Sequence, residues 1–574
     1  MNRRFLLKLA GLAAAAKLTA QTPAQTQPFC SLNQLGYRPR DPKTATLRGL
    51  SSQDTTFTIR SLDSNELLFT GALPPPTLDN ASGDQVRLAT FSSLAKPGTY
   101  RLEAPGLFSD TFHISNDVYA DALRLTMRSY YGQRCGCAVD LGQGYSHPPC
   151  HLAGAYGIGS NQHGAVPNHG GWHDAGDYGR YIVNSGITTG TLLWAWELYP
   201  QSLRNLHLDL PESHHPLPDY LAEIRWNLNW MLSLQDTDGG VFHKQTSAAF
   251  SPFVMPQDDL LLSQIIGTGS APYKSTCATA DLAAVMAIAA RVYRPLDPAF
   301  AQTCLAAAKS AWSWASAHPD VTFKNPPGVT TGEYGDPHCA DELLWASAEL
   351  WRTTSEPQYE AAFLHGLPST PDQLTIGTPS WNNLASMACW TYALASPSGP
   401  DSGPWKDRIV EATRHAALDL VARQKSSGYG NTLALSDYIW GSNSVAANQS
   451  LLLLLSHHLH PDPETANAAL SNLHYLLGRN CHGVSWVTQL GHRPFLHPHH
   501  RPSAADGIPA PWPGLLSGGP NAHPADPTAR TLPQAPPMRM WLDDQRAYSM
   551  NEVAINWNAP LVFLLAFANQ NTPA

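Results

Sequence analysis

Hydrophobic and polar residues alternate in short runs near the start of the chain. A period of two predicts half-buried β-strands. The clearest predicted strands cover residues 56–60, 85–90, 99–103 and 110–114. A turn signal, Pro97-Gly98, stands directly before one of them. Short strands at this spacing predict a small antiparallel β-sandwich between about residues 29 and 115.

After residue 116 the apolar residues recur at intervals of three and four, which predicts helices. The predicted helices cover residues 118–131, 184–199, 220–235, 276–293, 300–317, 341–353, 359–365, 384–395, 405–424, 444–458, 463–477 and 554–568. The longest loop between them runs from about residue 495 to residue 540, and a loop of this length is usually functional. Because no crisp repeat is visible, about twelve helices in one domain favour a toroid of paired helices over a solenoid.

Length and composition narrow the class of protein. With 574 residues the chain is too long for one ordinary domain, so two or more are expected. Its hydrophobic fraction of 43% is enough to bury a large core. The net charge of −9 argues against nucleic acid as a partner.

Residues 1–24 have the features of a secretory signal peptide. Arg3 and Arg4 precede an apolar run that ends near Ala16, and Ala20 and Ala24 offer small residues for cleavage. The arginine pair is also similar to a twin-arginine signal, which directs export after folding. The apolar run is short for a bilayer span, and no later segment is expected to cross a membrane. The mature chain is therefore predicted to be secreted or periplasmic.

Two aspartates stand three residues apart in the segment from His169 to Tyr178, which reads HGGWHDAGDY. At this spacing Asp174 and Asp177 can both face one water molecule, and glycines let the backbone approach a ligand. Neighbouring carboxyls raise one pKa while the other group stays ionised, which suits a general base. The structural alternative is a turn in which an aspartate caps a helix.

Glu552 is flanked by Asn, Trp and Tyr at the predicted start of an apolar helix. A carboxyl group in such surroundings tends to have a raised pKa and can hold a proton to donate. The alternative is a glutamate favoured there by the helix dipole. A further cluster, HPHHR at residues 497–501, offers hydrogen-bond donors for sugar hydroxyls or a carboxylate, but its geometry is poor for one metal ion.

The nine cysteines are odd in number and scattered, so a disulfide scaffold is not expected. Two thiolates with two imidazoles make a closed tetrahedral zinc site, and the predicted ligands are Cys135, Cys150, His151 and His169. Cys137 is an alternative to Cys135, and four unlinked residues are the alternative to a site. A closed site leaves no open position for water, which argues against a zinc hydrolase.

Three motifs resemble glycoside hydrolase family 9, the inverting cellulases, in the order in which that family has them. They are residues 170–178, residues 476–480 with 485–488 running to 497–501, and residues 548–552 with 556–560. The resemblance covers nearly the whole chain and implies an (α/α)6 barrel, in agreement with the helix count. The strand-rich start resembles the immunoglobulin-like domain of one branch of the family. The predicted domains are residues 25–116 for this β-sandwich and 117–574 for the barrel.

The resemblance also implies roles for single residues. Asp177 matches the general base, Asp174 its partner in holding the water, and Glu552 the general acid. The residues that match sugar-binding positions or aromatic platforms are His499, Arg501, Asp543, Trp440 and Trp557. For the two tryptophans, simple packing is the alternative. The same branch of the family has a zinc site with closely similar ligands and spacing.

A calcium site is a further implication of the resemblance. Asp341-Glu342 resembles an acidic pair that binds calcium in family members, and carboxylate oxygens suit this hard cation. A third family ligand, often an aspartate after a tryptophan, is Asn382 after Trp381 in this chain, which departs from the pattern. The alternative is a pair of solvent-facing acids at a helix start.

The function that the resemblance implies is hydrolysis of β-1,4-linked glucan with inversion, by endo action. The rival within the family is an exo-acting β-glucosidase or glucosaminidase. The rival from another class is a non-catalytic glucan-binding protein, which would lack an acid or a base. The expected partner is a β-glucan polysaccharide or oligosaccharide, and a monomer is favoured.

Overall fold

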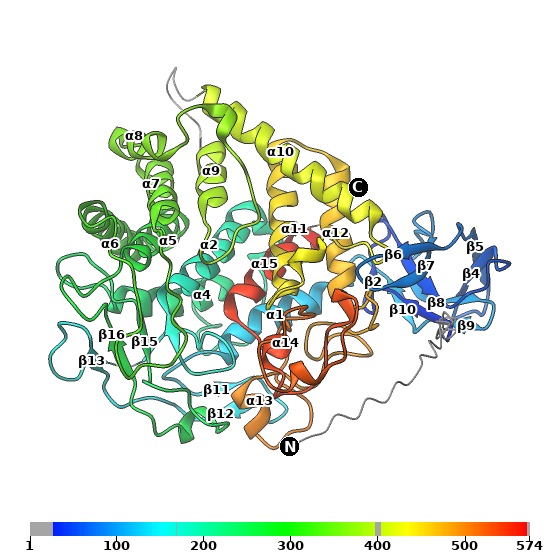
Figure 1. Cartoon of the computed structure of the whole chain (residues 1–574), viewed down its shortest axis with the longest axis horizontal. Coiled ribbons are helices and arrows are strands. Elements are labelled where there is room, and N and C mark those ends of the chain that lie inside the picture. The colour runs from blue at the N-terminus through cyan, green and yellow to red at the C-terminus, as the bar shows by residue number, and fades with distance from the viewer. Residues whose placement is uncertain (1–26, 168, 396–402, 571–574) are drawn as a thin grey trace, which may run out of the picture.

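The N-terminal module contains two β-sheets that enclose one apolar core (Figure 1). The computed structural model describes residues 27–167, 169–395 and 403–570, so the predicted signal peptide lies outside the described residues. The first sheet has the order β1 (Phe29–Ser31), β3 (Thr44–Arg48), β7 (Asp84–Thr90) and β6 (Thr77–Asp79). The second has the order β2 (Gly36–Tyr37), β10 (Phe112–Ile114), β8 (Gly98–Ala104), β4 (Thr56–Ser61) and β5 (Leu67–Ala72), with β9 (Leu107–Phe108) paired to β8. The predicted β-sandwich is confirmed.

All twelve predicted helices are present in the second domain. They are α1 (Ala120–Gly132), α2 (Ile182–Leu198), α4 (Asp219–Ser233), α5 (Thr276–Tyr293), α6 (Pro298–Ala317), α7 (Ala340–Thr354), α8 (Pro357–Gly366), α9 (Ala385–Leu394), α10 (Gly403–Ser426), α11 (Ser442–Leu459), α12 (Pro463–Leu476) and α15 (Ile555–Ala568). Three short helices were not predicted: α3 (Pro200–Leu203), α13 (Arg501–Ala505) and α14 (Tyr548–Asn551). Single turns of 3-10 helix lie at Pro256–Asp258, Pro371–Gln373, Leu435–Asp437, Ala529–Thr531 and Pro537–Arg539.

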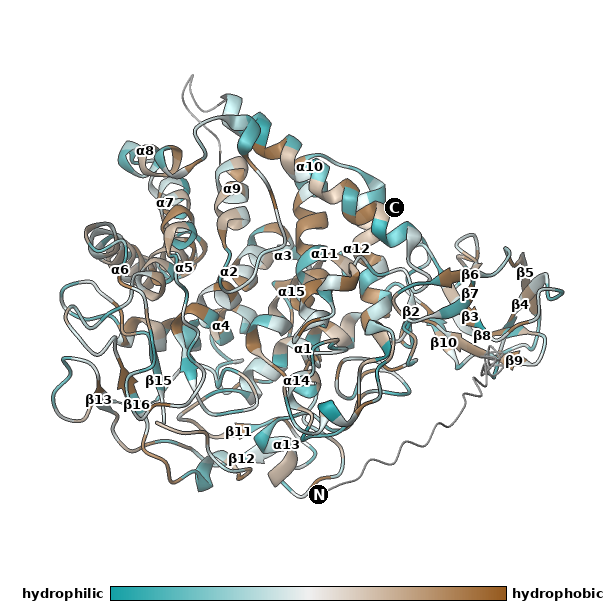
Figure 2. Ribbon diagram, in the orientation of Figure 1, coloured by the Kyte–Doolittle hydropathy of each residue, from teal (hydrophilic) through white to brown (hydrophobic). Residues whose placement is uncertain are grey.

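Six of the helices close an inner ring. Helix α2 packs against α5, then α5 against α7, α7 against α9, α9 against α11, α11 against α15, and α15 against α2. The other six, α1, α4, α6, α8, α10 and α12, each pack on the outside of one or two of these. In Figure 2 the inner α15 is mostly brown, while the outer α10 mixes teal and brown. Two concentric rings of six helices form the expected (α/α)6 barrel.

By length and composition alone helix α5 could cross a membrane, although the sequence was predicted to have no such segment after the leader. In the described structure 94% of its most apolar 18-residue window is buried. Inner helices of a barrel contact neighbours on every side, so they lack the polar face of a surface helix. The composition of α5 is therefore that of a core helix.

Short strands in the loops at one end of the barrel form small sheets. The strands β13 (Tyr156–Ile158), β16 (Gln264–Ile266), β15 (Lys244–Thr246) and β14 (Arg180–Tyr181) make one sheet in this order, and β11 (Val139–Asp140) pairs with β12 (Ser146–His147). Strand β14 runs directly into α2, and β15 follows α4. Strands of two or three residues are too short for an alternating pattern to reveal them.

A disulfide joins Cys277, near the start of α5, to Cys339, the residue before α7. The sequence showed only that the cysteines are scattered, and spacing alone does not reveal which pairs meet. The bond ties two neighbouring helices of the inner ring at the same end.

The motif at residues 476–480 lies where the β-sandwich meets the barrel. The Ser31 hydroxyl donates to the carbonyl oxygen of Asn480 at 2.8 Å, and Gln34 Nε2 donates to the carbonyl oxygen of Gly483 at 2.9 Å. Cys481, between them, is buried. This motif therefore joins the two domains.

Candidate active site

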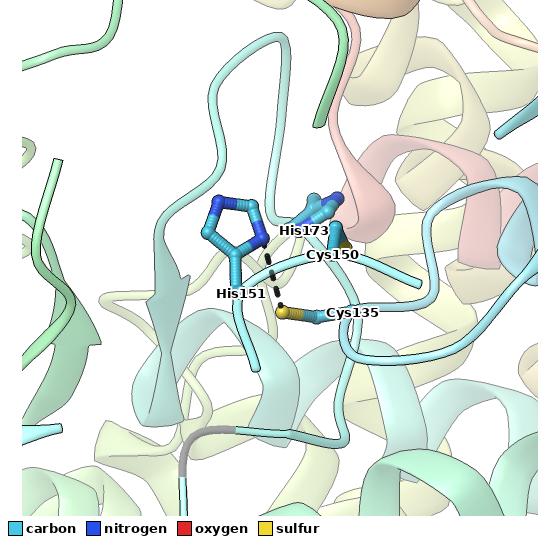
Figure 3. A group of neighbouring side chains, drawn as sticks. All are labelled: Cys135, Cys150, His151 and His173. Carbon is cyan, nitrogen blue, oxygen red and sulfur yellow. Dashed lines mark hydrogen bonds between the residues drawn. The ribbon is translucent and has the colours of Figure 1, made fainter. Parts of the chain in front are cut away.

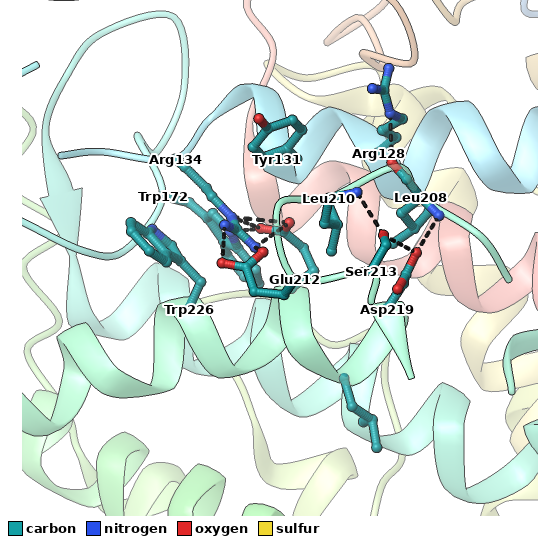
Figure 4. A network of polar contacts seen from close by, with 12 residues as sticks. Arg128, Tyr131, Arg134, Trp172, Leu208, Leu210, Glu212, Ser213, Asp219 and Trp226 are labelled. Carbon is teal, nitrogen blue, oxygen red and sulfur yellow. Dashed lines mark hydrogen bonds and ion pairs between the residues drawn. The ribbon is translucent and has the colours of Figure 1, made fainter. Parts of the chain in front are cut away.

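Arg134 anchors the segment that carries the two aspartates (Figure 4). It follows α1, and its guanidinium donates to Glu223 and Glu212 at distances of 3.0–3.1 Å. The indole Nε1 of Trp172 donates to Oε1 of Glu223 at 2.8 Å. Arg134 and Glu223 are both buried. A buried charge without an opposite charge beside it is costly, so the ion pair holds the two side chains in one position. Through Trp172 this network holds the chain just before Asp174.

Asp174 is buried, and hydrogen bonds hold both its side chain and its backbone; its N–H donates to the Gly179 carbonyl at 2.9 Å. Its Oδ1 accepts from Nδ2 of Asn184 at 2.5 Å, and its Oδ2 accepts from the Tyr334 hydroxyl at 2.7 Å. Its backbone carbonyl accepts from the N–H of Ile555, the first residue of α15, at 2.8 Å. Burial, and then the charge of Asp177, raise the pKa of Asp174 to about 7.

Asp177 presents one carboxylate oxygen without a protein donor. Its Oδ2 accepts from the Gly179 N–H at 3.1 Å and from the Tyr181 hydroxyl at 3.3 Å. Among the described residues no donor contacts Oδ1, which leaves that oxygen for a water molecule. Tyr181 is the N-cap of α2 and no side chain caps that helix. The alternative in which an aspartate serves as a helix cap is therefore not what the structure contains.

Glu552 lies between two helices, which corrects the prediction that it begins one. It follows α14 with φ −60° and ψ 154°, and Ala554 before α15 is also extended. The extended link lets the Glu552 carbonyl accept from the Gly518 N–H at 2.8 Å. Removal from water, and then the charges of Asp177 and Asp174, raise the pKa of Glu552 to about 8.

These three carboxyl groups line one cleft of about 640 Å³. The predicted platforms Trp440 and Trp557 line it too, and the Trp440 indole opposes the rise in the pKa of Glu552. Trp440 is 41% exposed, so simple packing does not describe it. Sequence reasoning missed other aromatic residues of the lining, namely Phe250, Tyr181, Tyr334 and Trp381. No local motif marks them, because they come from separate parts of the chain: Tyr181 lies on β14 and the others lie on loops.

His499 and Arg501 lie beside the cleft and are not among its lining residues. His499 Nδ1 is 2.8 Å from the carbonyl oxygen of Gln545. Arg501 donates from Nη1 to the Gly176 carbonyl at 2.7 Å and from Nε to the Ser251 carbonyl at 2.9 Å. In this arrangement both side chains bind backbone carbonyls and support the loops around the two aspartates.

Gly176 allows the segment at residues 499–501 to pack directly on the aspartate loop. A methyl group at this position would lie 1.8 Å from the His499 carbonyl oxygen. We expect Gly176→Ala to displace that segment, to lower the free energy of unfolding by about 1–3 kcal/mol and to reduce kcat. Urea unfolding and activity assays measure both effects. Gly377→Ala is the control, since nothing lies within 4 Å of its added methyl group. A Gly176→Ala variant as stable and active as wild type contradicts this packing.

Asp543 ties a loop to the site and does not line the cleft. Its two carboxylate oxygens accept from the N–H groups of Leu496 and His497, each at 2.9 Å. These contacts hold the start of the segment that continues to His499. The predicted sugar contact is therefore absent from the described cleft lining.

Two thiols and two imidazoles gather next to the aspartate loop (Figure 3). The group is Cys135, Cys150, His151 and His173, and their sulfur and nitrogen atoms all lie within 4.8 Å of one another. Sγ of Cys135 is 3.6 Å from Nδ1 of His151. Three of the four residues are those predicted from the spacing.

The fourth predicted residue, His169, is corrected to His173. In the described structure His169 is exposed and outside the group, while His173 is buried within it. Gly170 and Gly171 have φ values of 93° and 75°, so the chain turns between the two histidines and only the second faces the thiols. Cys137, the alternative to Cys135, is also outside the group.

The acidic pair at the start of α7 is not solvent-facing. Glu342 is fully buried and neither of its oxygens has a hydrogen-bond partner, while Asp341 accepts from the Leu384 N–H at 2.6 Å. Asp281 on α5 is likewise buried without a partner. Burial, and then the charge of Asp281, raise the pKa of Glu342 to about 11. Asn382, at the position where this chain departs from the family's third calcium ligand, lines the cleft.

The sequence matches two families, one for each domain. Residues 119–565 match glycosyl hydrolase family 9, and residues 25–109 match the cellulase N-terminal ig-like domain. The chain belongs to glycosyl hydrolase family 9. It is 35% identical to Endoglucanase D of Acetivibrio thermocellus over 567 residues, which cover 97% of this chain and 86% of that protein. It is 33% identical to a cellodextrinase of Butyrivibrio fibrisolvens over 559 residues, covering 93% and 98%.

The fold matches solved structures over both domains. A Zn-binding triple mutant of the family 9 endoglucanase J30 superposes with a TM-score of 0.87 at 33% sequence identity. The match covers 93% of this chain and 100% of that one. The expected combination of an immunoglobulin-like domain and an (α/α)6 barrel is thereby confirmed.

Proposed function

We propose that this chain hydrolyses internal β-1,4-glucosidic bonds of cellulose or a related β-glucan, with inversion of configuration. The observation that carries the proposal is that Asp177 and Glu552, from opposite parts of the chain, line the same cleft. Tryptophans in that lining suit sugar rings, whose apolar faces stack on aromatic side chains. Membership in glycosyl hydrolase family 9 supports the same activity.

The hydrogen bonds of the site fit two distinct roles. Asp177, with its free Oδ1, takes a proton from water as the water attacks the anomeric carbon. Asp174 helps to orient that water. Glu552 has a raised pKa, so at neutral pH it carries the proton that the leaving oxygen needs. Inversion requires the base and the acid on opposite sides of the sugar, with room for one water.

Product analysis tests this proposal. Proton NMR of cello-oligosaccharide hydrolysis should show the α anomer as the first new reducing end, and the viscosity of carboxymethyl-cellulose should fall early. A β anomer as first product rules out inversion. No hydrolysis of either substrate rules out the function.

The second candidate is exo action on short oligosaccharides. The identity to a protein named cellodextrinase favours it. Release of glucose alone from cello-oligosaccharides, with viscosity unchanged, would select exo action over endo action. Release of glucosamine from its oligomers would instead identify a glucosaminidase.

We also propose that Cys135, Cys150, His151 and His173 hold a structural zinc ion. Two sulfur and two nitrogen donors within 4.8 Å are the donor set of closed zinc sites. Nε2 of His151 lies 3.2 Å from Oδ2 of Asp259, a carboxylate that can orient the histidine. Zinc in this site would cross-link the loop after α1 to the segment that carries the two aspartates.

Loss of one zinc ligand should loosen that segment. We expect Cys150→Ser to lower bound zinc from about one ion per chain to well below that, and to lower Tm by several degrees. Metal analysis and thermal unfolding measure both. Cys137→Ser is the matched control, because this thiol lies outside the group. A Cys150→Ser variant with full zinc content and unchanged Tm contradicts the site.

For the acidic cluster we propose calcium. Asp281 and Glu342 are buried carboxyl groups without hydrogen-bond partners, Asp336 and Asp341 add charge nearby, and oxygen donors suit this ion. Added calcium should raise Tm in the wild type and have no such effect in Glu342→Gln.

We further propose that the chain is exported and acts as a monomer, either secreted from the cell or in the periplasm. The apolar leader behind Arg3 and Arg4 supports export. The Cys277–Cys339 disulfide suits an oxidising compartment.

A further inference from the structure

A buried lysine stands behind the cleft wall that carries Asp177. Lys244, on β15, is fully buried. Its Nζ donates to Oδ1 of Asn325 at 2.7 Å, to the carbonyl oxygen of Gly332 at 2.7 Å and to Oγ1 of Thr331 at 3.2 Å. All of these acceptors are neutral, and within the described part of the chain no carboxylate forms an ion pair with this ammonium. An ammonium buried without an ion pair is costly, so the site around it needs another source of stabilisation.

Lys244 is connected to the base through Tyr181. The two residues are paired directly across the antiparallel strands β14 and β15. Nζ lies 5.5 Å from the centroid of the Tyr181 ring, within the range of a cation–π contact. The same ring carries the hydroxyl that donates to Oδ2 of Asp177 at 3.3 Å. Gly332, whose carbonyl oxygen accepts from Nζ, also lies close to Tyr181. A methyl group added to Gly332 would be 3.3 Å from the Tyr181 hydroxyl.

The charges of the cleft explain why a cation is useful there. Asp174, Asp177 and Glu552 line the same space, and each carboxylate disfavours ionisation of the others. A base must nevertheless be ionised when the acid is protonated. Burial lowers the pKa of Lys244 to about 7, and the charge of Asp177 opposes that change, so the two groups interact.

We propose that Lys244 is a positioning residue for the general base, holding Tyr181 against Asp177 and favouring the ionised form of Asp177 through its positive charge. This inference rests on the proposed function, in which Asp177 activates water. The contacts with Asn325, Thr331 and Gly332 set the position of the ammonium, and the strand pairing sets the position of the phenol.

Other titratable or charged groups face this pair from neighbouring elements. They are Asp174, Tyr181, Tyr334, Glu552, Arg501 and His499 around Asp177, and His243 and Glu333 around Lys244. A substitution of Lys244 removes none of these groups, so a change in the acidic limb of the pH profile reports on the loss of the ammonium and of its contact with Tyr181.

The test compares kcat and KM of wild type and Lys244→Met on a soluble cello-oligosaccharide between pH 4 and pH 9. We expect the acidic limb of kcat/KM, which follows ionisation of the base, to move upward by about one pH unit in Lys244→Met. At pH values well below the wild-type limb this corresponds to a fall in kcat/KM of about tenfold, most of it in kcat, with KM changed less than twofold. Lys309→Met, which removes a partly exposed lysine on α6, is the control and should leave the profile unchanged.

A folded Lys244→Met variant with the wild-type acidic limb overturns the inference. Tyr181→Phe provides a second test that keeps the ammonium, and it should also lower kcat more than it changes KM. If Lys244→Met does not fold, a Tyr181→Phe variant with wild-type kcat and pH profile overturns the inference alone. A wild-type protein that hydrolyses no cello-oligosaccharide overturns the proposed function together with it.

Discussion

Glu552→Gln is expected to lower kcat on cello-oligosaccharides by about 10³-fold. Glutamine has nearly the same shape as glutamate, so it should occupy the same place in the cleft lining. It has no proton of suitable acidity for the leaving sugar oxygen. With an aryl β-cellobioside whose phenolate leaves without protonation, the loss should be far smaller. A steady-state comparison of the two substrates measures the difference.

The pH profile gives an independent check of this assignment. The pKa of Glu552 is raised to about 8, so the acid is protonated below that value and loses its proton as the pH rises through it. Wild-type activity should therefore fall on the alkaline side near pH 8, and Glu552→Gln should lack this limb. Glu411→Gln, on an exposed face of α10, should behave as wild type. A Glu552→Gln variant that keeps a tenth of wild-type kcat contradicts the role of acid.

Asp177→Asn should remove activity on every substrate, by about 10³- to 10⁴-fold. An amide cannot take a proton from water, and attack by water is required whatever group leaves. The Gly179 N–H and the Tyr181 hydroxyl donate to Oδ2 of Asp177, and the amide oxygen of asparagine can accept both hydrogen bonds. The fold should therefore remain. Kinetics on the oligosaccharide and on the aryl glycoside, with thermal unfolding as a check, measure the effect.

A comparison of Asp177→Asn with Glu552→Gln on the two substrates identifies the base. Asp174→Asn should cost less than Asp177→Asn, because Asp174 is bound on both oxygens and only helps to orient the water. If Asp177→Asn keeps its activity on the aryl glycoside, as Glu552→Gln should, Asp177 is not the base. If Asp174→Asn is the more severe change, the two aspartates exchange roles.

The helices of the barrel were predictable because their periodicity is strong. Inner and outer helices alike appear within a few residues of the predicted bounds. Glu552 was misplaced at a helix start because the apolar run of α15 begins three residues later and the extended link has no signal of its own. In that conformation the Glu552 carbonyl accepts a hydrogen bond from the Gly518 N–H, and the two residues are distant in sequence.

The choice between His169 and His173 could not be made from spacing. Both are close enough in sequence to the thiols, and only the positive φ values of Gly170 and Gly171 direct the second histidine inward. In the same way, Phe250 and Lys244 carry no motif. Their relation to the cleft depends on where separate loops and strands meet, which is a property of the folded chain.

The hydrogen bond from Ile555 to the carbonyl of Asp174 has a consequence for biosynthesis. Helix α15 closes the inner ring by packing against α2 and α11, and its first residue is the partner that the Asp174 carbonyl lacks until this helix has been made. A nascent chain translated only as far as residue 551 has neither the closed ring nor the carboxyl group of Glu552. We therefore expect chains still attached to the ribosome, and proteolytic fragments that end before α15, to lack hydrolytic activity.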